Sequence, residues 1–284
     1  MTEAPDLVKR CYRLVVKLQH GPFLKLSKEC DMRVLTSISV IVACLWTAFV
    51  PVVLAQDERN ENWFRVDIIQ VIPDRLNDFI DLQVDDLIPA YKRAGVPFRS
   101  VWQTAEFGNT YERVFATPIA SMADFDRGGP LAVALDPDRL ARIAEEFRRY
   151  LVSRQSFAVR YRPDLSVESA DVGGRALAQL TTVEITPGRG GEWEAFFRQN
   201  LEQFRRAGVV FGMYQFVYGP GPAKWQIVQN HRSFDELNEP GIITQAFGSD
   251  ASSVLLSDIS GLVMSVERTV LRYDPELSFS AEAP

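Results

Sequence analysis

The chain has 284 residues, of which 46% are hydrophobic and 24% are charged, and its formal net charge is −6. This composition is typical of a globular protein, and its acidity disfavours nucleic acid and anionic membrane surfaces as partners. Its three cysteines all precede Gln56, so a chain that begins there contains no disulfide, no thiolate metal site and no cysteine nucleophile.

A long apolar run over residues 34–55 follows a polar leader. Met32 and the arginine after it give a short positive segment, the apolar run follows, and Pro51 interrupts it before an ending of small or apolar residues at Ala55. This order of segments is that of a secretory signal peptide.

We therefore expect residues 1–31 to be a leader ahead of the true start, and residues 32–55 to be a signal peptide that is removed. The mature protein would begin at Gln56, carry a net charge of −9, be exported to the periplasm or secreted, and have no stable membrane insertion. The alternative is a membrane anchor over residues 34–55, because the run is about long enough to cross a bilayer and the leader is basic.

An internal repeat organises the rest of the chain. Residues 160–166, RYRPDLS, return 112 residues later as RYDPELS at residues 272–278. Residues 92–96, KRAGV, likewise recur as RRAGV at residues 205–209. Matching segments in one order and at nearly one spacing indicate two copies of one structural unit.

We expect a first unit over residues 60–166, a polar linker over 167–175, a second unit over 176–278 and a tail over 279–284. Each unit shows the order strand, helix, strand, strand, helix, strand. That order predicts a ferredoxin-like antiparallel sheet with both helices on one face. Large aromatic side chains would be costly to leave in water on the other face, so we expect the two units to cover each other.

In the first unit, alternation of apolar and polar residues predicts the strands, and apolar residues at three- and four-residue steps predict one continuous helix over 76–91. A second helix begins at Pro137, and its inner face is expected to extend to Leu151. The predicted strands are residues 64–71, 98–105, 111–118 and 157–162.

In the second unit, one helix carries Trp193, Phe196, Phe197, Leu201 and Phe204 on a single face. The predicted strands are residues 180–185, 211–218, 225–231 and 262–273.

Residues 89–96, PAYKRAGV, precede a strand ending near Gly108 and a second strand running into Ser121, and the pattern recurs at 206–209 and 230–234. In this pattern the chain resembles the dimeric α+β barrel superfamily, which includes antibiotic-biosynthesis monooxygenase-like, NIPSNAP-like and stress-responsive barrel domains. The resemblance spans both units and carries no catalytic motif. It implies an α+β fold in which two ferredoxin-like units pair their sheets around a ligand space, here within one chain. The protein would be a monomeric pseudo-dimer or a homodimer.

His231 and Arg113 are the candidate catalytic residues. His231 is the one histidine after Gln56, so it could serve as a general base or as an axial ligand to haem, or it could simply bond a neighbouring carbonyl. Arg113 could stabilise a developing anion. Because no multi-histidine cluster and no glycine-rich phosphate loop is found, we expect no metal site and no cofactor.

Aligning the third strands of the two units places Arg113, Phe115 and Thr117 against Trp225, Ile227 and Gln229. This mixed aromatic and polar row suits the wall of a ligand cavity, and it equally suits a filled core in which Arg113 pairs with an acid such as Asp67. The predicted ligand-binding residues are Asp67, Trp102, Phe115, Tyr214, Trp225 and Gln229.

Three functions remain open from the sequence. The first is an exported barrel that binds a small, partly apolar molecule between its two sheets without catalysis. The second is a cofactor-independent monooxygenase-like or isomerase-like enzyme, with His231 or Arg113 handling the proton or the anion. The third is a haem-binding barrel, which the resemblance implies because related barrels include haem proteins.

Overall fold

The computed structural model describes residues 62–169, 176–221 and 223–280 of the chain. The expected leader, the signal peptide or anchor, and residues 170–175 of the expected linker lie outside this range. The described chain is α+β. The strands are β1 (Trp63–Val71), β2 (Phe98–Thr104), β3 (Glu112–Pro118), β4 (Leu151–Tyr161), β5 (Leu177–Ile185), β6 (Gly212–Tyr218), β7 (Lys224–His231), β8 (Val263–Tyr273) and β9 (Phe279–Ser280). The α-helices are α3 (Leu76–Leu82), α4 (Ile88–Arg93), α5 (Pro130–Ala134), α6 (Pro137–Arg149), α7 (Gly190–Arg206) and α8 (Ile242–Ser260).

Eight strands close into an antiparallel barrel. Their order is β3-β1-β4-β6-β7-β5-β8-β2, and β2 pairs back onto β3. Strands β1 to β4 come from the first half of the described chain and β5 to β8 from the second. The ring therefore has two seams between the halves, where β4 pairs with β6 and β8 pairs with β2.

The two seams are short and alike. At one, Tyr161 of β4 lies opposite Tyr214 of β6, with ring centroids 5.1 Å apart. At the other, Tyr273 of β8 lies opposite Trp102 of β2, also with centroids 5.1 Å apart. Each seam is thus fixed by backbone hydrogen bonds and by one aromatic pair, which adds about 1 kcal/mol beyond area burial.

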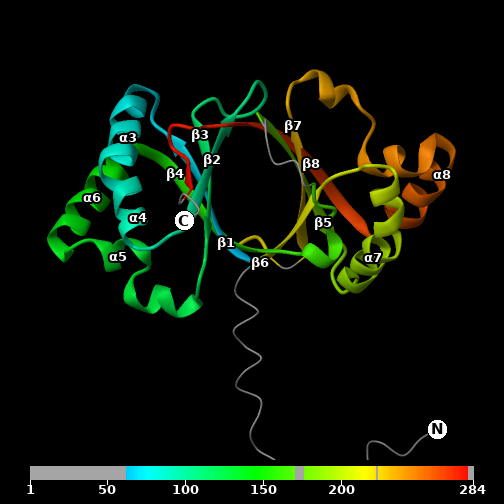
Figure 1. Ribbon diagram of the computed structural model, residues 1–284, viewed down its shortest axis with the longest axis horizontal. Helices are drawn as coiled ribbons and strands as arrows, with labels where there is room; N and C mark the ends of the chain where they lie inside the picture. Colours follow the sequence, from blue (N-terminus) through cyan, green and yellow to red (C-terminus); the bar gives the residue numbers. More distant parts are fainter. Residues whose placement is uncertain (1–61, 170–175, 222, 281–284) are drawn as a thin grey trace, which may run out of the picture. The chain divides into compact units, whose positions relative to one another are not determined.

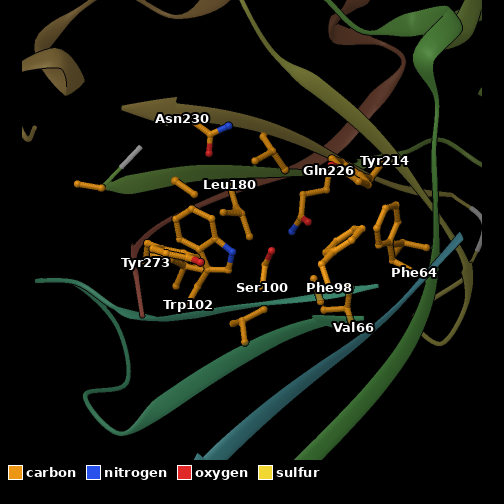
Figure 2. Close-up of a pocket in the computed structure, with 17 residues that line it drawn as sticks. Phe64, Val66, Phe98, Ser100, Trp102, Leu180, Tyr214, Gln226, Asn230 and Tyr273 are labelled. Atoms are coloured by element: carbon orange, nitrogen blue, oxygen red, sulfur yellow. The ribbon is translucent and has the colours of Figure 1, made fainter. Parts of the chain in front are cut away.

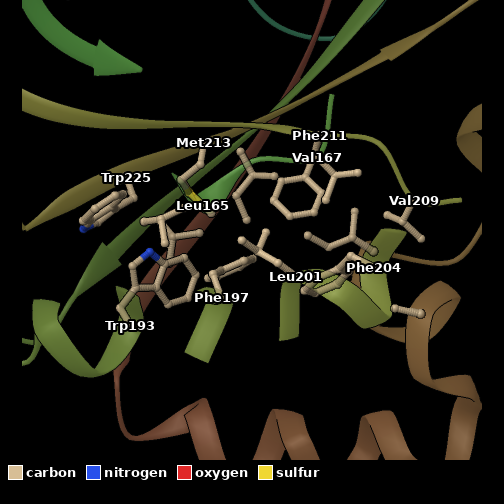
Figure 3. Close-up of a cluster of buried hydrophobic side chains, with 14 of the residues drawn as sticks. Leu165, Val167, Trp193, Phe197, Leu201, Phe204, Val209, Phe211, Met213 and Trp225 are labelled. Atoms are coloured by element: carbon tan, nitrogen blue, oxygen red, sulfur yellow. The ribbon is translucent and has the colours of Figure 1, made fainter. Parts of the chain in front are cut away.

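The helices pack against the outside of the barrel, with α3 to α6 on one flank and α7 and α8 on the opposite flank (Figure 1). This arrangement follows from strand alternation, because the outward faces of several strands carry large apolar side chains such as Phe115 and Trp225 that pack beneath the helices. On α7, Trp193, Phe197, Leu201 and Phe204 recur at steps of four, four and three residues, and all four are buried. Figure 3 shows them packed against side chains of the sheet. In the described chain, no helix is both long and apolar enough to cross a membrane.

The repeated motif joins the two halves. In the first half it supplies Leu165, which is fully buried in the core of the second half with α7. In the second half it supplies Leu277, which is 1% exposed in the core of the first half. Each leucine is thus inserted into the opposite half.

The serine after each leucine completes the contact. Ser166 Oγ accepts a hydrogen bond from the backbone N–H of Met213 on β6 at 2.9 Å. Ser278 Oγ accepts one from the N–H of Val101 on β2 at 2.8 Å. We call residues 163–166 and 275–278 the first and second clasp. Each clasp thus ties its own half to the other half of the barrel.

The helix expected over residues 76–91 is interrupted by a π-helical turn at Gln83–Leu87. Gln83 is fully buried there and accepts a hydrogen bond from Arg99 Nη1 at 2.9 Å. The Arg99 guanidinium lies 4.5 Å from the ring centroid of Tyr91 and 4.3 Å from that of Phe115. Burial lowers the pKa of Arg99. The π-helical turn thus contains Gln83, whose buried polar contact with Arg99 cannot be predicted from the spacing of apolar residues.

Two expected boundaries differ from the structure. Leu151 was assigned to the inner face of a helix, but α6 ends at Arg149 and Leu151 begins β4. The expected tail also begins with a strand, because β9 pairs with Phe98 and Arg99 of β2. In both cases backbone pairing with a neighbouring strand overrides local pattern.

Candidate ligand-binding site

The inner faces of the strands enclose a lumen that side chains do not fill. On β7, Gln226, Val228 and Asn230 line it, whereas the alternating Trp225 and Ile227 belong to the core under the helices. The lumen contains two adjoining cavities, which we call the aromatic chamber and the polar chamber.

The aromatic chamber has a volume of about 810 Å³. This volume is within the usual range for sites that take a small molecule. The lining residues come from all eight strands or the residue just before one. They are Phe64, Val66, Phe98, Ser100, Trp102, Val114, Ala116, Val159, Ala176, Ala178, Leu180, Tyr214, Gln226, Val228, Asn230, Leu271 and Tyr273.

Two groups of aromatic rings form opposite walls of the aromatic chamber (Figure 2). Trp102 and Tyr273 meet edge to face, with an interplanar angle of 65°. On the other side, the ring of Phe64 lies 6.1 Å from that of Phe98 and 6.1 Å from that of Tyr214. The separation of the two groups leaves space between them for a flat ligand.

The polar groups of the aromatic chamber are few and neutral. Ser100 and Gln226 point into the space between the two aromatic walls (Figure 2). Gln226 Nε2 also donates to Thr182 Oγ1 at 3.3 Å, which orients its amide. No Asp, Glu, Lys, Arg or His is among the described residues that line this chamber. A bound molecule would meet hydroxyl and amide groups but no fixed charge.

The polar chamber has a volume of about 880 Å³ and lies toward the other end of the barrel. Six residues line both chambers, so the two adjoin: Val66, Val114, Val159, Leu180, Gln226 and Leu271. Beyond this waist the inward side chains become polar, and the lining includes Gln70, Glu112, Ser153, Gln155, Thr182, Lys224, Glu267 and Thr269.

Comparison with known proteins identifies the fold but no family. No known family model matches the chain, and no curated protein matches its sequence. A solved protein described as anthrone oxidase-like has a TM-score of 0.52 at 11% identity, covering 80% of this chain and 96% of its own. A candidate monooxygenase from Fusobacterium nucleatum has a TM-score of 0.50 at 9% identity, covering 78% and 94%. A chlorite dismutase variant from Candidatus Nitrospira defluvii has a TM-score of 0.51 at 7% identity, covering 76% and 92%.

The chain has the dimeric α+β barrel fold. The expected α+β barrel fold is confirmed. At such low identities the likeness establishes the fold and leaves function to be argued from the site.

Two of the predicted ligand residues, Trp102 and Tyr214, lie in the wall of the aromatic chamber. The remaining predicted site residues do not line it. Phe115 and Trp225 are buried in the cores beneath the helices. Gln229 lies on the same face of β7 as Trp225. Of the two alternatives for the mixed row, the filled core is the one found, because this row faces the helices and not the lumen.

Arg113 belongs to that helix-facing row. Its Nε lies 3.6 Å from Oδ2 of Asp274, an ion pair too long for a hydrogen bond, and the side chain is 6% exposed. Burial lowers the pKa of Arg113, and the nearby Asp274 carboxylate opposes this shift. The acidic partner of Arg113 is thus Asp274, which precedes the second clasp, and not Asp67, the partner that the sequence suggested. Away from both chambers, Arg113 is not placed to stabilise a ligand anion.

Asp67 lies in a separate polar cluster outside the lumen. Its carboxylate accepts from Arg154 Nε and Nη2 at 3.0 and 2.9 Å, and from Ser156 Oγ. Arg65 Nε is 3.0 Å from its second oxygen. These four side chains hold β1 and β4 together, and Asp67 does not line either chamber, where a ligand contact was predicted.

His231 also lies on the helix-facing side of β7. Its Nδ1 is 3.8 Å from Glu236 Oε2, and burial lowers the pKa of the imidazole. Because the side chain faces away from both chambers, His231 does not fit an axial ligand to a haem held in the lumen. Within the described ranges, no group of three or more His, Cys, Asp or Glu could hold a metal ion.

Several lining residues were missed by sequence reasoning. Among them, Ser100 and Gln226 provide the inward polar groups, and Phe98 and Tyr273 provide aromatic wall. One signal could have found this face. The lumen face carries Ala116, Ala176 and Ala178, and these small side chains leave space unfilled. The helix-facing side carries large residues that fill a core.

Proposed function

We propose that the aromatic chamber binds a neutral, planar aromatic molecule, and that the protein acts as a binding protein for it. The observation that supports this most strongly is the lining, which has five aromatic and no charged side chains. A charged ligand group would lose its hydration there without gaining a counterion, which costs several kcal/mol. A neutral aromatic ligand would gain ring contacts with Trp102 and Phe64 and would retain hydrogen bonds to Ser100 and Gln226.

A second candidate function is oxidation of such a molecule by dioxygen. The Ser100 hydroxyl and the Gln226 amide point into the chamber, where they could donate to an oxygen that gains negative charge on deprotonation of the ligand. The anthrone named for one structural neighbour is a neutral tricyclic aromatic ketone, the class of molecule that this chamber suits. No histidine or carboxylate of the described chamber lining would act as the base, so the proton of the ligand would pass to water.

The test compares two tryptophans. Trp102 lines the chamber, and Trp225 is 1% exposed in the core. We expect Trp102→Leu to weaken binding of 2-naphthol or 4-methylumbelliferone at least about tenfold, because one chamber wall is lost, and to cost about 1 kcal/mol of unfolding free energy from the lost ring pair with Tyr273. We expect Trp225→Leu to cost about 3 kcal/mol of unfolding free energy and to leave the affinity of the folded protein nearly unchanged. Fluorescence titration and urea unfolding measure the two effects.

Absence of binding by the wild-type protein, or equal affinities of wild type and Trp102→Leu, would contradict the binding function. Conversion of the bound compound with consumption of dioxygen would favour the oxidase. Ser100→Ala and Gln226→Leu should then lower the rate constant more than the affinity, because their hydrogen bonds would strengthen as charge develops.

We further propose that the two halves are tandem copies of one ferredoxin-like unit, and that a single chain forms the complete barrel as a monomer. The repeated motif in the sequence and the closure of eight strands within one chain support this proposal. We also propose that the protein is exported after removal of residues 1–55, on the signal-peptide pattern alone, with a membrane anchor as the alternative. N-terminal sequencing of the protein recovered from its host would distinguish a start at Gln56 from a retained apolar run.

A further inference from the structure

The polar chamber differs in kind from the interior of a filled barrel. Small closed barrels are filled with packed, mainly apolar side chains. Here most inward positions on one side of the waist carry polar groups, although Ile68, Phe157 and Phe216 also line the chamber. Hydroxyl and carboxamide groups are provided by Gln70, Gln155, Thr182 and Thr269. They come from four different strands, so the polarity surrounds the space and is not confined to one wall.

The two chambers form one elongated lumen. Along β8, Tyr273 lines the aromatic chamber and Glu267 lines the polar chamber. Six steps along the extended chain separate them, roughly 20 Å at 3.3 Å per step. A ligand held between the aromatic walls would reach past the waist only if it carried a second group on its long axis.

The side chain of Gln70 indicates which hydrogen-bonding groups the second part of the ligand carries. Its Oε1 is buried and has no hydrogen-bond partner among the described residues. Buried acceptors nearly always have a hydrogen-bond donor. We therefore expect a ligand in the polar chamber to donate an O–H or N–H group to this oxygen. The hydroxyl of Thr269 faces the same chamber and can both donate and accept.

The charges of the polar chamber exclude a simple ionic group. Glu112, Glu267 and Lys224 line it, so both signs are present. Two carboxylates would repel a phosphate or a carboxylate, and the lysine would oppose a strongly cationic group. Carboxylate, amide, hydroxyl and ammonium groups together can serve a substituent that both donates and accepts many hydrogen bonds.

We infer that the ligand is an aromatic compound carrying a neutral polyhydroxyl substituent, such as a sugar. Its ring occupies the aromatic chamber, and its hydroxyl groups occupy the polar chamber. This inference rests on the proposed binding function and adds the chemical class of the second half of the ligand.

The test uses matched pairs of probes and variants of the full chain. The probes are 4-methylumbelliferone and 2-naphthol, each compared with its β-D-glucoside, and affinities are measured by fluorescence titration. We expect each glucoside to bind about tenfold more tightly than its aglycone, which corresponds to one or two net hydrogen bonds. The double variant Gln70→Met/Thr269→Val should abolish that gain and leave the affinity for the aglycone unchanged.

Thr181→Val is the control, because Thr181 is next to Thr182 on β5 and its side chain lies on the opposite face of the strand. It should retain the full gain. If the aglycones bind and the glucosides bind equally or more weakly, the inference is overturned and the proposed function stands. If no compound of either kind binds, both are overturned. If each glucoside still binds more tightly than its aglycone in the double variant, the placement of the sugar in the polar chamber is also overturned.

Discussion

Asp164, in the first clasp, belongs to a network of charged side chains outside the lumen. Arg162 Nε and Nη2 donate to its two oxygens at 2.8 Å each, and Arg198 Nη2 donates at 3.0 Å. The hydrogen bonds from Arg162 are the main cause that lowers the pKa of Asp164 to about 2. In the unfolded chain the pKa of an aspartate is about 3.9. Asp164 therefore stabilises the fold above about pH 4, and this contribution is lost as the pH falls toward 2.

We predict that Asp164→Asn reduces the loss of stability between about pH 4 and pH 2, measured as the shift of the urea midpoint. The effect will be modest because the Asp164 side chain is 46% exposed and solvent screens the pair. The matching residue of the second clasp is Glu276, which makes no ion pair among the described side chains, so Glu276→Gln serves as the control. Identical midpoint shifts in wild type and Asp164→Asn would show that the network contributes nothing.

At the scale of elements, the clasps fix how the halves join. We predict that Leu277→Ala costs about 2–5 kcal/mol of unfolding free energy, because it leaves a cavity in a core built mainly by the other half. Ser278→Ala should cost about 1–3 kcal/mol, because it removes the acceptor for the Val101 N–H. Urea unfolding measures both. Leu165→Ala should fall in the same range as Leu277→Ala, and a change below about 0.5 kcal/mol in either would contradict cross-half insertion.

Most of these elements are predictable from local patterns. Alternation identifies the strands, and the four buried residues of α7 are evident from their spacing. The π-helical turn at Gln83–Leu87 is not, because it accompanies a contact with Arg99 that is distant in sequence. The start of β4 at Leu151 was missed for a related reason, since its pairing with Val71 is a tertiary contact.

The candidate site was predictable in location but mostly not in residues. The superfamily resemblance implied a ligand space between two paired sheets, yet strand alternation alone cannot tell which face of a strand meets that space. Both faces carry apolar and aromatic side chains, because helices cover one and a ligand space adjoins the other. The row containing Arg113 and Phe115 therefore resembled a ligand wall, although Arg113 pairs with Asp274 outside the lumen.

For the whole molecule, closure of the barrel within one chain creates a lumen with two unlike ends. Five aromatic side chains line one end, most side chains at the other end are polar, and six residues line both chambers. The clasps and aromatic pairs at both seams hold this lumen open without filling it. The protein can therefore present a preformed space to a ligand, which lowers the conformational entropy lost on binding.

In the proposed function, one chain encloses one binding site for a small aromatic molecule. Native mass spectrometry of the purified protein with 4-methylumbelliferone and its glucoside tests this directly, because it reports chain number and ligand number together. We predict a monomer that carries one ligand, and loss of the bound mass in Trp102→Leu. A dimer that holds one ligand between two chains would contradict the intramolecular barrel, and a monomer that binds neither compound would contradict the binding function.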